Sequence, residues 1–144
     1  VQRLEGSPLA DLMPGSTELW LDGGHNPAAG QIIAETLAGM PDVKDTWLIV
    51  GMLQSQDTMG FLRPIAPALK GLVAIPLPGK NAGTLPHETA DIGVRLGIES
   101  FVAEDSYAAA RLLGDKIGKN ARVLICGSLR LAGDVLGDIP GFKI

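Results

Sequence analysis

Five short apolar segments, separated by longer segments in which apolar residues repeat with helical spacing, constrain the fold of this 144-residue chain most strongly. Most of these segments are apolar at every position, which is typical of strands that helices cover on both faces. Strands that alternate with helices predict a mostly parallel α/β sheet. The predicted strands are residues 18–22, 46–52, 71–77, 99–103 and 121–127.

The intervening segments carry the start and stop signals of helices. Asn26, Asp57 and Ser128 are suited to cap a helix, as is Ser106 or Asp105. Pro27 fits the first position of a helix. The helices are predicted at residues 27–40, 58–69, 86–96, 106–118 and 128–137, the second of them irregular because it contains two prolines.

Apolar spacing also predicts the buried side chains of two helices. They are Ile32, Ile33, Thr36 and Leu37 in the first, and Ala109, Leu112, Leu113 and Ile117 in the fourth. Ahead of the first apolar segment, residues 1–6 fit a short edge strand and residues 7–15 a loop. Residues 76–86, rich in proline and glycine, predict a mobile surface loop.

Composition narrows the classes of partner. Twelve basic and sixteen acidic residues are scattered without runs, and aromatic residues make up 4% of the chain. A nucleic-acid surface needs clustered positive charge, so we expect no nucleic-acid partner. The apolar runs are far shorter than the roughly 20 residues that cross a bilayer. We therefore expect no membrane partner, and a small molecule or a protein remains.

The single cysteine and the first residues bear on the cellular compartment. Cys126 lies in an apolar run and has no second cysteine to pair with, so we expect a buried thiol in a reducing cytoplasm. The first fifteen residues lack the features of a signal peptide. The chain does not begin with methionine, and we expect it to be part of a longer protein.

Loops at the carboxyl ends of parallel strands are where such sheets bind ligands. Two of these loops carry suitable chemistry. After the first strand, Asp22 and His25 flank a glycine pair; either they bind a ligand, or Asp22 accepts from turn amides and His25 is merely exposed. After the last strand, Ser128 either helps to bind an anion or simply caps its helix.

Several chemical classes lack their sequence patterns. The chain has no GxxxxGK[ST] phosphate loop, no GxGxxG after a strand and no CxxC or HExxH metal motif. The second histidine, His87, is expected on the surface at a helix start. We expect no metal site on this chain.

Three segments in order, LWLDGGHNPAAG, LIVGMLQSQD and VLICGSLRLAGDVL, resemble the C-terminal domain of folylpolyglutamate synthase and of bifunctional dihydrofolate synthase. This family belongs to the Mur-ligase-like, ATP-dependent amide-forming ligases, and the resemblance covers nearly the whole chain. It implies one domain over residues 1–144: a Rossmann-like three-layer sandwich of about six strands, one of them antiparallel. A preceding N-terminal ATPase domain would carry the phosphate loop and the magnesium ligands.

The resemblance also implies a reaction and roles for residues. MgATP would phosphorylate a folate or dihydropteroate carboxyl group, and L-glutamate would attack the acyl phosphate in the cleft between the domains. Asp22 would contact the nucleotide near its ribose, and His25 and Ser128 would place the glutamate. No catalytic residue is assigned to this domain alone. The residues that would shape the site are Gly23, Gly24, Asn26, Pro27 and Gly127, with Asp57 as a further candidate.

The chain departs from the family at one position and leaves other functions open. Gln56 stands where the family commonly has a lysine, and Arg3 is not expected to be the family's nucleotide-contacting arginine, which lies before the first strand. The alternatives are a stand-alone module that binds a small anion or a protein partner, and the equivalent domain of a Mur-type peptidoglycan ligase. The isolated domain is expected to be inactive.

Overall fold

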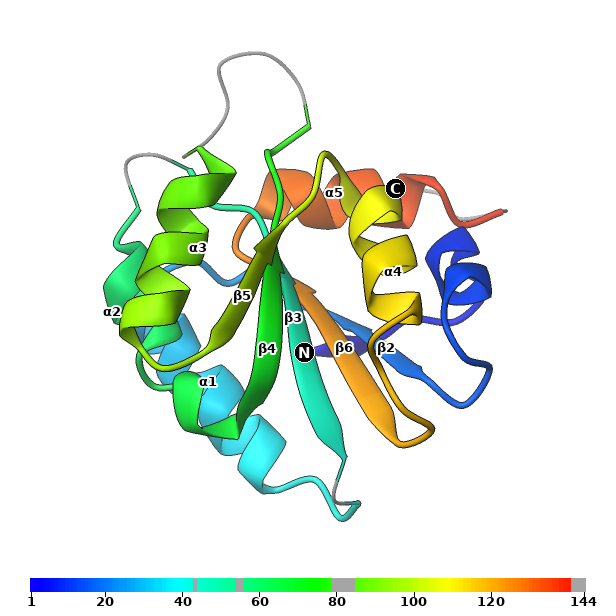
Figure 1. Ribbon diagram of the computed structural model, residues 1–144, viewed down its shortest axis with the longest axis horizontal. Helices are drawn as coiled ribbons and strands as arrows, with labels where there is room; N and C mark the ends of the chain where they lie inside the picture. Colours follow the sequence, from blue (N-terminus) through cyan, green and yellow to red (C-terminus); the bar gives the residue numbers. More distant parts are fainter. Residues whose placement is uncertain (43, 54–55, 79–84, 141–144) are drawn as a thin grey trace.

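Within the described residues, five parallel strands and one antiparallel strand form a single sheet (Figure 1). The structure is a computed structural model that describes residues 1–42, 44–53, 56–78 and 85–140. The strand order is β1-β2-β6-β3-β4-β5, and only the β1–β2 pair is antiparallel. The strands are β1 (Gln2–Arg3), β2 (Glu18–Leu21), β3 (Asp45–Val50), β4 (Leu69–Ala74), β5 (Glu99–Val102) and β6 (Ala121–Cys126). The predicted mostly parallel sheet with an antiparallel edge strand is confirmed.

Helices cover both faces of this sheet, as predicted. The α-helices are α1 (Pro27–Ala38), α2 (Thr58–Leu62), α3 (Pro86–Arg95), α4 (Ser106–Gly114) and α5 (Leu129–Gly137); the short 3-10 helices are η1 (Pro8–Leu12) and η2 (Ala66–Ala68). One apolar layer joins α1, α2 and α3 to the sheet, and the other joins α4, α5 and η1 (Figure 1). The fold is therefore a three-layer α/β sandwich.

The central strand β3 shows why its sequence is apolar at every position. Leu48 and Val50 face α1, α2 and α3, whereas Trp47 and Ile49 face α4 and α5. None of these four side chains is more than 5% exposed. Because successive residues of a strand point to opposite faces, a strand covered on both sides needs apolar residues throughout.

The predicted end of the second helix, the predicted start of the strand after it and the loop predicted at residues 7–15 all differ from the structure. Helix α2 ends at Leu62 rather than Leu69, since Pro64 and Pro67 cannot continue a regular helix; the chain forms η2 and enters β4 two residues earlier than expected. Residues 7–15, expected as a loop, contain η1, which Ser7 caps. The expected loop at 76–86 lies largely outside the described residues.

The buried stripe of α1 is narrower than predicted. Ile33 and Leu37 are buried, but Ile32 is 60% exposed. The helix contacts α2 through Gly30, where a Cβ atom would clash with the backbone carbonyl of Phe61. This close approach sets the rotation of α1 about its axis and turns Ile32 toward solvent. In α4, Ala109 and Leu113 are buried as predicted, but the helix ends at Gly114 rather than Gly118.

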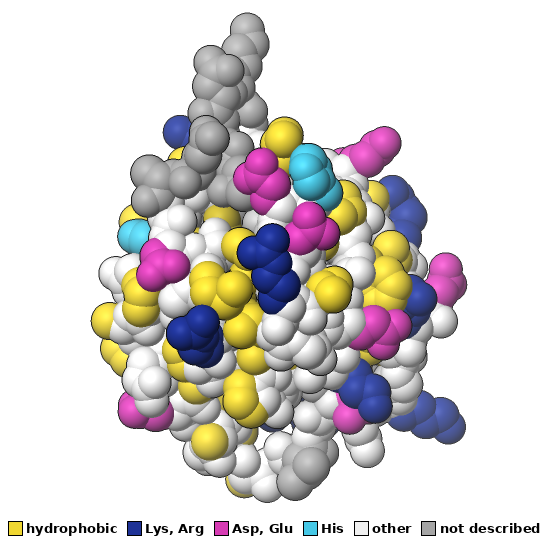
Figure 2. Space-filling model, turned by 60° about the vertical axis from the view of Figure 1, so that its left-hand side comes forward, with side chains coloured by type: hydrophobic (Ala, Val, Ile, Leu, Met, Phe, Trp, Pro, Cys, Tyr) yellow, Lys and Arg dark blue, Asp and Glu magenta, His cyan; other side chains and the backbone are white. Residues whose placement is uncertain are grey.

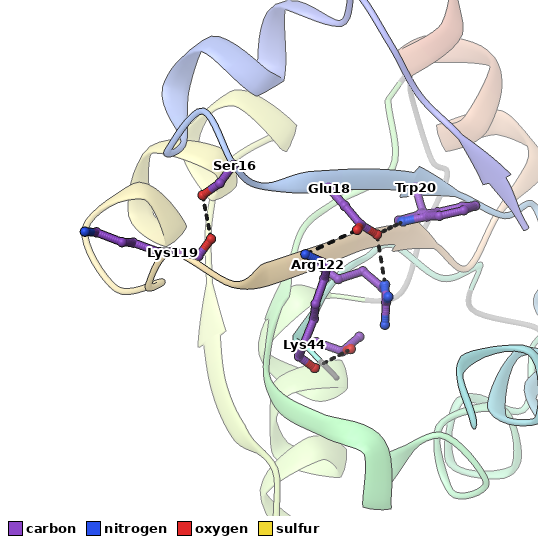
Figure 3. A network of polar contacts seen from close by, with 7 residues as sticks. Ser16, Glu18, Trp20, Lys44, Lys119 and Arg122 are labelled. Carbon is purple, nitrogen blue, oxygen red and sulfur yellow. Dashed lines mark hydrogen bonds and ion pairs between the residues drawn. The ribbon is translucent and has the colours of Figure 1, made fainter. Parts of the chain in front are cut away.

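At the amino edge of the sheet, three donors converge on Glu18 (Figure 3). Its Oε1 accepts from Trp20 Nε1 at 3.0 Å and from Arg122 Nε at 3.3 Å, and its Oε2 lies 3.4 Å from Lys44 Nζ. Partial burial works to raise the pKa of Glu18, but the hydrogen bonds from Trp20, Lys44 and Arg122 outweigh it and hold this pKa below its ordinary value. The network therefore ties β2, β6 and the start of β3 together.

The surface over α2 and α3 carries charges of both signs that are scattered among apolar side chains (Figure 2). Basic side chains do not gather into a patch on this face. None of the described helices is long and apolar enough to cross a membrane.

Candidate functional site

The turn after β2 is held by the carboxylate of Asp22. Its Oδ1 accepts a hydrogen bond from the Gly24 amide at 2.7 Å, and its Oδ2 lies 2.9 Å from the nitrogen of Val1. A Cβ atom at Gly24 would lie 2.7 Å from the same Oδ1 and 2.7 Å from Ala29 Cβ, so a side chain here would crowd the turn and the start of α1. Asp22 keeps 18% of its side chain exposed, which leaves part of the carboxylate accessible to a ligand.

The loops after β2 and β6 pack directly against each other. Gly127 N donates to Gly24 O at 3.1 Å. A Cβ atom at Gly23 would lie 2.5 Å from Leu129 Cδ2, and one at Gly127 would lie 2.5 Å from Gly51 O. Gly127 also has φ of +107°, a conformation that side-chain-bearing residues rarely adopt. These glycines bring the ends of β2, β3 and β6 to within contact distance.

The predicted caps are confirmed at three helix starts along this edge. Asn26 Oδ1 accepts from Ala29 N at 2.8 Å, Asp57 Oδ1 from Gly60 N at 2.9 Å, and Ser128 Oγ from Arg130 N at 3.1 Å. Pro27 occupies the first position of α1. Each cap satisfies an amide that the helix itself leaves unpaired.

His25 has no comparable capping role. Its Nδ1 lies 3.3 Å from Gly23 O, and the side chain is half-buried. A proton on Nδ1 would donate this hydrogen bond, leaving Nε2 as the ring nitrogen available to a ligand. The imidazole is thus oriented by the turn that precedes α1.

A cavity of about 220 Å³ opens where these loops meet. It is lined by His25, Leu53, Gln56, Ser128, Leu129 and Arg130. The structure therefore brings His25 and Ser128 together, as the sequence analysis expected, whereas Asp22 and Asp57 are not among the lining residues. Ser128 itself is only 2% exposed.

Three lining residues escaped the sequence analysis. Leu53 lies in the segment after β3, and Leu129 and Arg130 open α5. Leu129 is 72% exposed, and Arg130 is exposed beside it. The sequence signal that could have indicated Arg130 is its position: it is a basic residue two positions after Ser128, the serine predicted to bind an anion.

Gln56, at the position where the sequence resemblance led us to expect a lysine, is held by the backbone. Its Oε1 accepts from Leu53 N at 2.7 Å. This hydrogen bond holds the carboxamide at the wall of the cavity but gives that position no charge.

A second cavity, of about 270 Å³, lies on the other side of α5. Four carboxylates line it, those of Glu104, Asp105, Asp134 and Asp138. Burial, with the charges of Asp138 and Asp105, raises the pKa of Asp134. Tyr107 donates a hydrogen bond to Asp138 at 2.9 Å, and this bond is the main cause of the raised pKa of the tyrosine. Such a cavity repels anions.

The single cysteine lies in the core of the protein. Cys126 is 1% exposed, and burial raises the pKa of its thiol, so it is a core side chain as predicted rather than a nucleophile.

Among residues 1–42, 44–53, 56–78 and 85–140, no group of three or more His, Cys, Asp or Glu side chains could hold a metal ion. These residues do not fit a magnesium site.

Solved structures of folylpolyglutamate synthases have a similar fold. A bifunctional folylpolyglutamate synthase/dihydrofolate synthase from Yersinia pestis superimposes with a TM-score of 0.71 and 24% identity over 85% of this chain and 28% of that chain. The Mycobacterium tuberculosis folylpolyglutamate synthase, complexed with ADP and AMPPCP, gives 0.71 and 23% over 92% and 30%. The Thermotoga maritima enzyme gives 0.73 and 20% over 99% and 30%.

The chain spans less than a third of the length of these synthases. No protein-family model matches the sequence, and no curated protein matches it. The resemblance carried by the three sequence motifs is thus confirmed at the level of the fold: this chain has the fold of one part of a folylpolyglutamate synthase.

Proposed function

We propose that this chain is the C-terminal, glutamate-binding domain of a cytoplasmic ATP-dependent ligase that adds L-glutamate to dihydropteroate, to folate or to both. The observation that carries the proposal is the cavity in which His25 and Ser128 meet, at the carboxyl edge of a sheet that folylpolyglutamate synthases share. One bifunctional synthase of this fold has been solved with Mn, AMPPNP and L-glutamate bound.

The proposed reaction divides between two domains. ATP transfers its γ-phosphoryl group to a carboxylate oxygen of the folate or dihydropteroate, which forms an acyl phosphate and ADP. The glutamate nitrogen then attacks the carbonyl carbon, the bond to the phosphate oxygen breaks, and the amine loses a proton. The nucleotide phosphates and magnesium would be held by an N-terminal ATPase domain, since the described residues offer no metal site.

This domain would supply contacts rather than the reacting groups. His25 and Ser128 would place the incoming glutamate, and Asp22 would accept from a ribose hydroxyl through the exposed part of its carboxylate. Gly23, Gly24, Asn26, Pro27 and Gly127 would keep the loops in contact. Asp57 would support the site by capping α2, which lies next to α1.

The test is to change His25 or Ser128 to alanine in the complete ligase. We expect the KM for L-glutamate to rise about tenfold for each, the size of one lost hydrogen bond to a charged ligand. Ser128→Ala also removes a helix cap, so Asp105→Ala is the matched control: it removes the cap of α4 and leaves the small cavity intact. An unchanged KM in both site variants would contradict the assigned roles.

The purified 144-residue chain provides a second test. Without the phosphate-binding half, we expect no turnover of ATP, folate and glutamate. Turnover by this chain alone would refute the two-domain arrangement.

Two alternatives remain to be separated from this proposal. The first is a stand-alone module that binds a small anion in the same cavity, and the second is the equivalent domain of a Mur-type peptidoglycan ligase. The reading frame upstream of Val1 distinguishes the stand-alone module from the proposed ligase domain. A glycine-rich phosphate loop encoded there supports the ligase, whereas an adjacent start codon supports the module. Folate-dependent turnover of the complete protein separates the second.

A further inference from the structure

The two cavities at the carboxyl edge differ in charge, and only one of them suits an anion. Among the residues that the structure describes, the larger cavity is lined by four acidic residues and by no basic one. The smaller one is lined by Arg130, His25, Gln56, Ser128 and two leucines, and by no acidic residue among those described. Opposite charges attract strongly in a partly enclosed site, so a carboxylate is drawn to the smaller cavity and repelled from the larger.

Within the smaller cavity, Arg130 is the side chain that carries a permanent charge. Its amide is tied to Ser128 Oγ at 3.1 Å, which fixes the residue in the first turn of α5. Arg130 is exposed, so its guanidinium is free of the desolvation that burial would impose. Gln56 is already engaged with the amide of Leu53 and brings no charge.

We propose that Arg130 binds a carboxylate of the incoming amino acid and thereby sets the affinity of the site for a dicarboxylic substrate. A guanidinium can donate two parallel hydrogen bonds to a carboxylate, a geometry that a carboxamide cannot reproduce. Leu53 and Leu129 flank it with apolar surface that matches the methylene groups of a glutamate side chain. This inference rests on the proposed function and adds a residue to it.

The experiment measures glutamate-dependent turnover in the complete ligase with Arg130→Ala, Arg130→Lys and the matched control Arg95→Ala. We expect Arg130→Ala to raise the KM for L-glutamate about 10- to 100-fold, as expected for loss of a charge-assisted pair, with kcat changed less than about threefold. Arg130→Lys keeps the positive charge but cannot donate two parallel hydrogen bonds, so it should recover only part of the affinity for L-glutamate. Arg95 is an exposed arginine in the last turn of α3 that lines neither cavity at the carboxyl edge, and its variant should behave as the wild type.

The outcomes separate the two proposals. A wild-type ligase that turns over glutamate while Arg130→Ala keeps its KM within about twofold overturns the role of Arg130 and leaves the proposed function standing. A loss of kcat without a change in KM, or equal effects of the alanine and lysine variants, also overturns that role. A wild-type protein without glutamate-dependent turnover overturns both proposals.

Discussion

The polar groups at the amino ends of the parallel strands and those at the carboxyl ends are satisfied in different ways. At the amino edge, Glu18 accepts from Trp20, Lys44 and Arg122, so charged side chains satisfy one another (Figure 3). At the carboxyl edge, Asp22, Asn26 and Ser128 accept from backbone amides instead. The first arrangement joins strands, whereas the second shapes loops and leaves His25 and Arg130 available to a ligand. Side-chain pairs thus stabilise the amino ends of the strands, whereas contacts between side chains and backbone shape the loops at the carboxyl ends.

The largest expected effect comes from breaking the packing of the carboxyl edge with Gly127→Ala. The added Cβ would meet Gly51 O at 2.5 Å and Met52 Sδ at 2.8 Å, and φ of +107° disfavours any side chain. Overpacking together with this backbone strain should cost about 3 kcal/mol of unfolding free energy. Urea unfolding followed by circular dichroism measures it.

Gly133→Ala is the matched control for that variant. Gly133 lies inside α5, and a Cβ there would meet no atom within 4 Å. Alanine favours helix, so this change should stabilise the protein by roughly 0.5–1 kcal/mol. Equal unfolding free energies for the two alanine variants would show that the contact between the loops after β3 and β6 is not tight.

At the amino edge, Glu18→Gln should have a smaller but measurable effect. The neutral carboxamide keeps the shape of the side chain while Arg122, 4% exposed, loses its charged partner. We expect a loss of about 1–2 kcal/mol in unfolding free energy. A loss below about 0.3 kcal/mol would show that the network contributes no net stability.

The pH dependence of the same variant sharpens this prediction. The pKa of Glu18 is held below its ordinary value of 4.5, so the folded state favours the ionised carboxylate. Its contribution is complete above about pH 5 and is lost as the pH falls through the lowered pKa. Unfolding free energies of the wild type and Glu18→Gln should therefore converge as the pH falls below the ordinary value of 4.5, and a constant difference would contradict the assignment.

The smallest effect is expected for a single cap at the carboxyl edge. Asn26→Ala removes the acceptor for Ala29 N and should cost about 1 kcal/mol of unfolding free energy. Asn26→Asp keeps an acceptor and should restore most of it. If alanine costs nothing, water satisfies the amide as well as Asn26 does.

Local signals predicted the elements of the fold better than their ends. The caps at Asn26, Asp57 and Ser128 could be predicted because capping depends on residues within three positions of each other. The exposure of Ile32 could not, because it follows from the contact of Gly30 with Phe61 on another helix.

The candidate site was predictable only in part for the same reason. The rule for parallel sheets indicated the end of the strands at which the cavity of His25 and Ser128 lies, and the glycines and Ser128 indicated two of the loops that meet there. The cavity, however, is formed where the segments after β2, β3 and β6 meet, and no single segment reveals that Leu53 and Arg130 line the same space as His25.

The position of β6 has a consequence for biosynthesis. This strand comes last among the described strands yet lies between β2 and β3, so a nascent chain that has not yet released residues 121–126 exposes two unpaired strand edges. Such edges invite pairing with other chains. Truncation ahead of β6 therefore removes more than a terminal element: it separates β2 from β3 at the centre of the sheet and removes Ser128 from the cavity that it shares with His25.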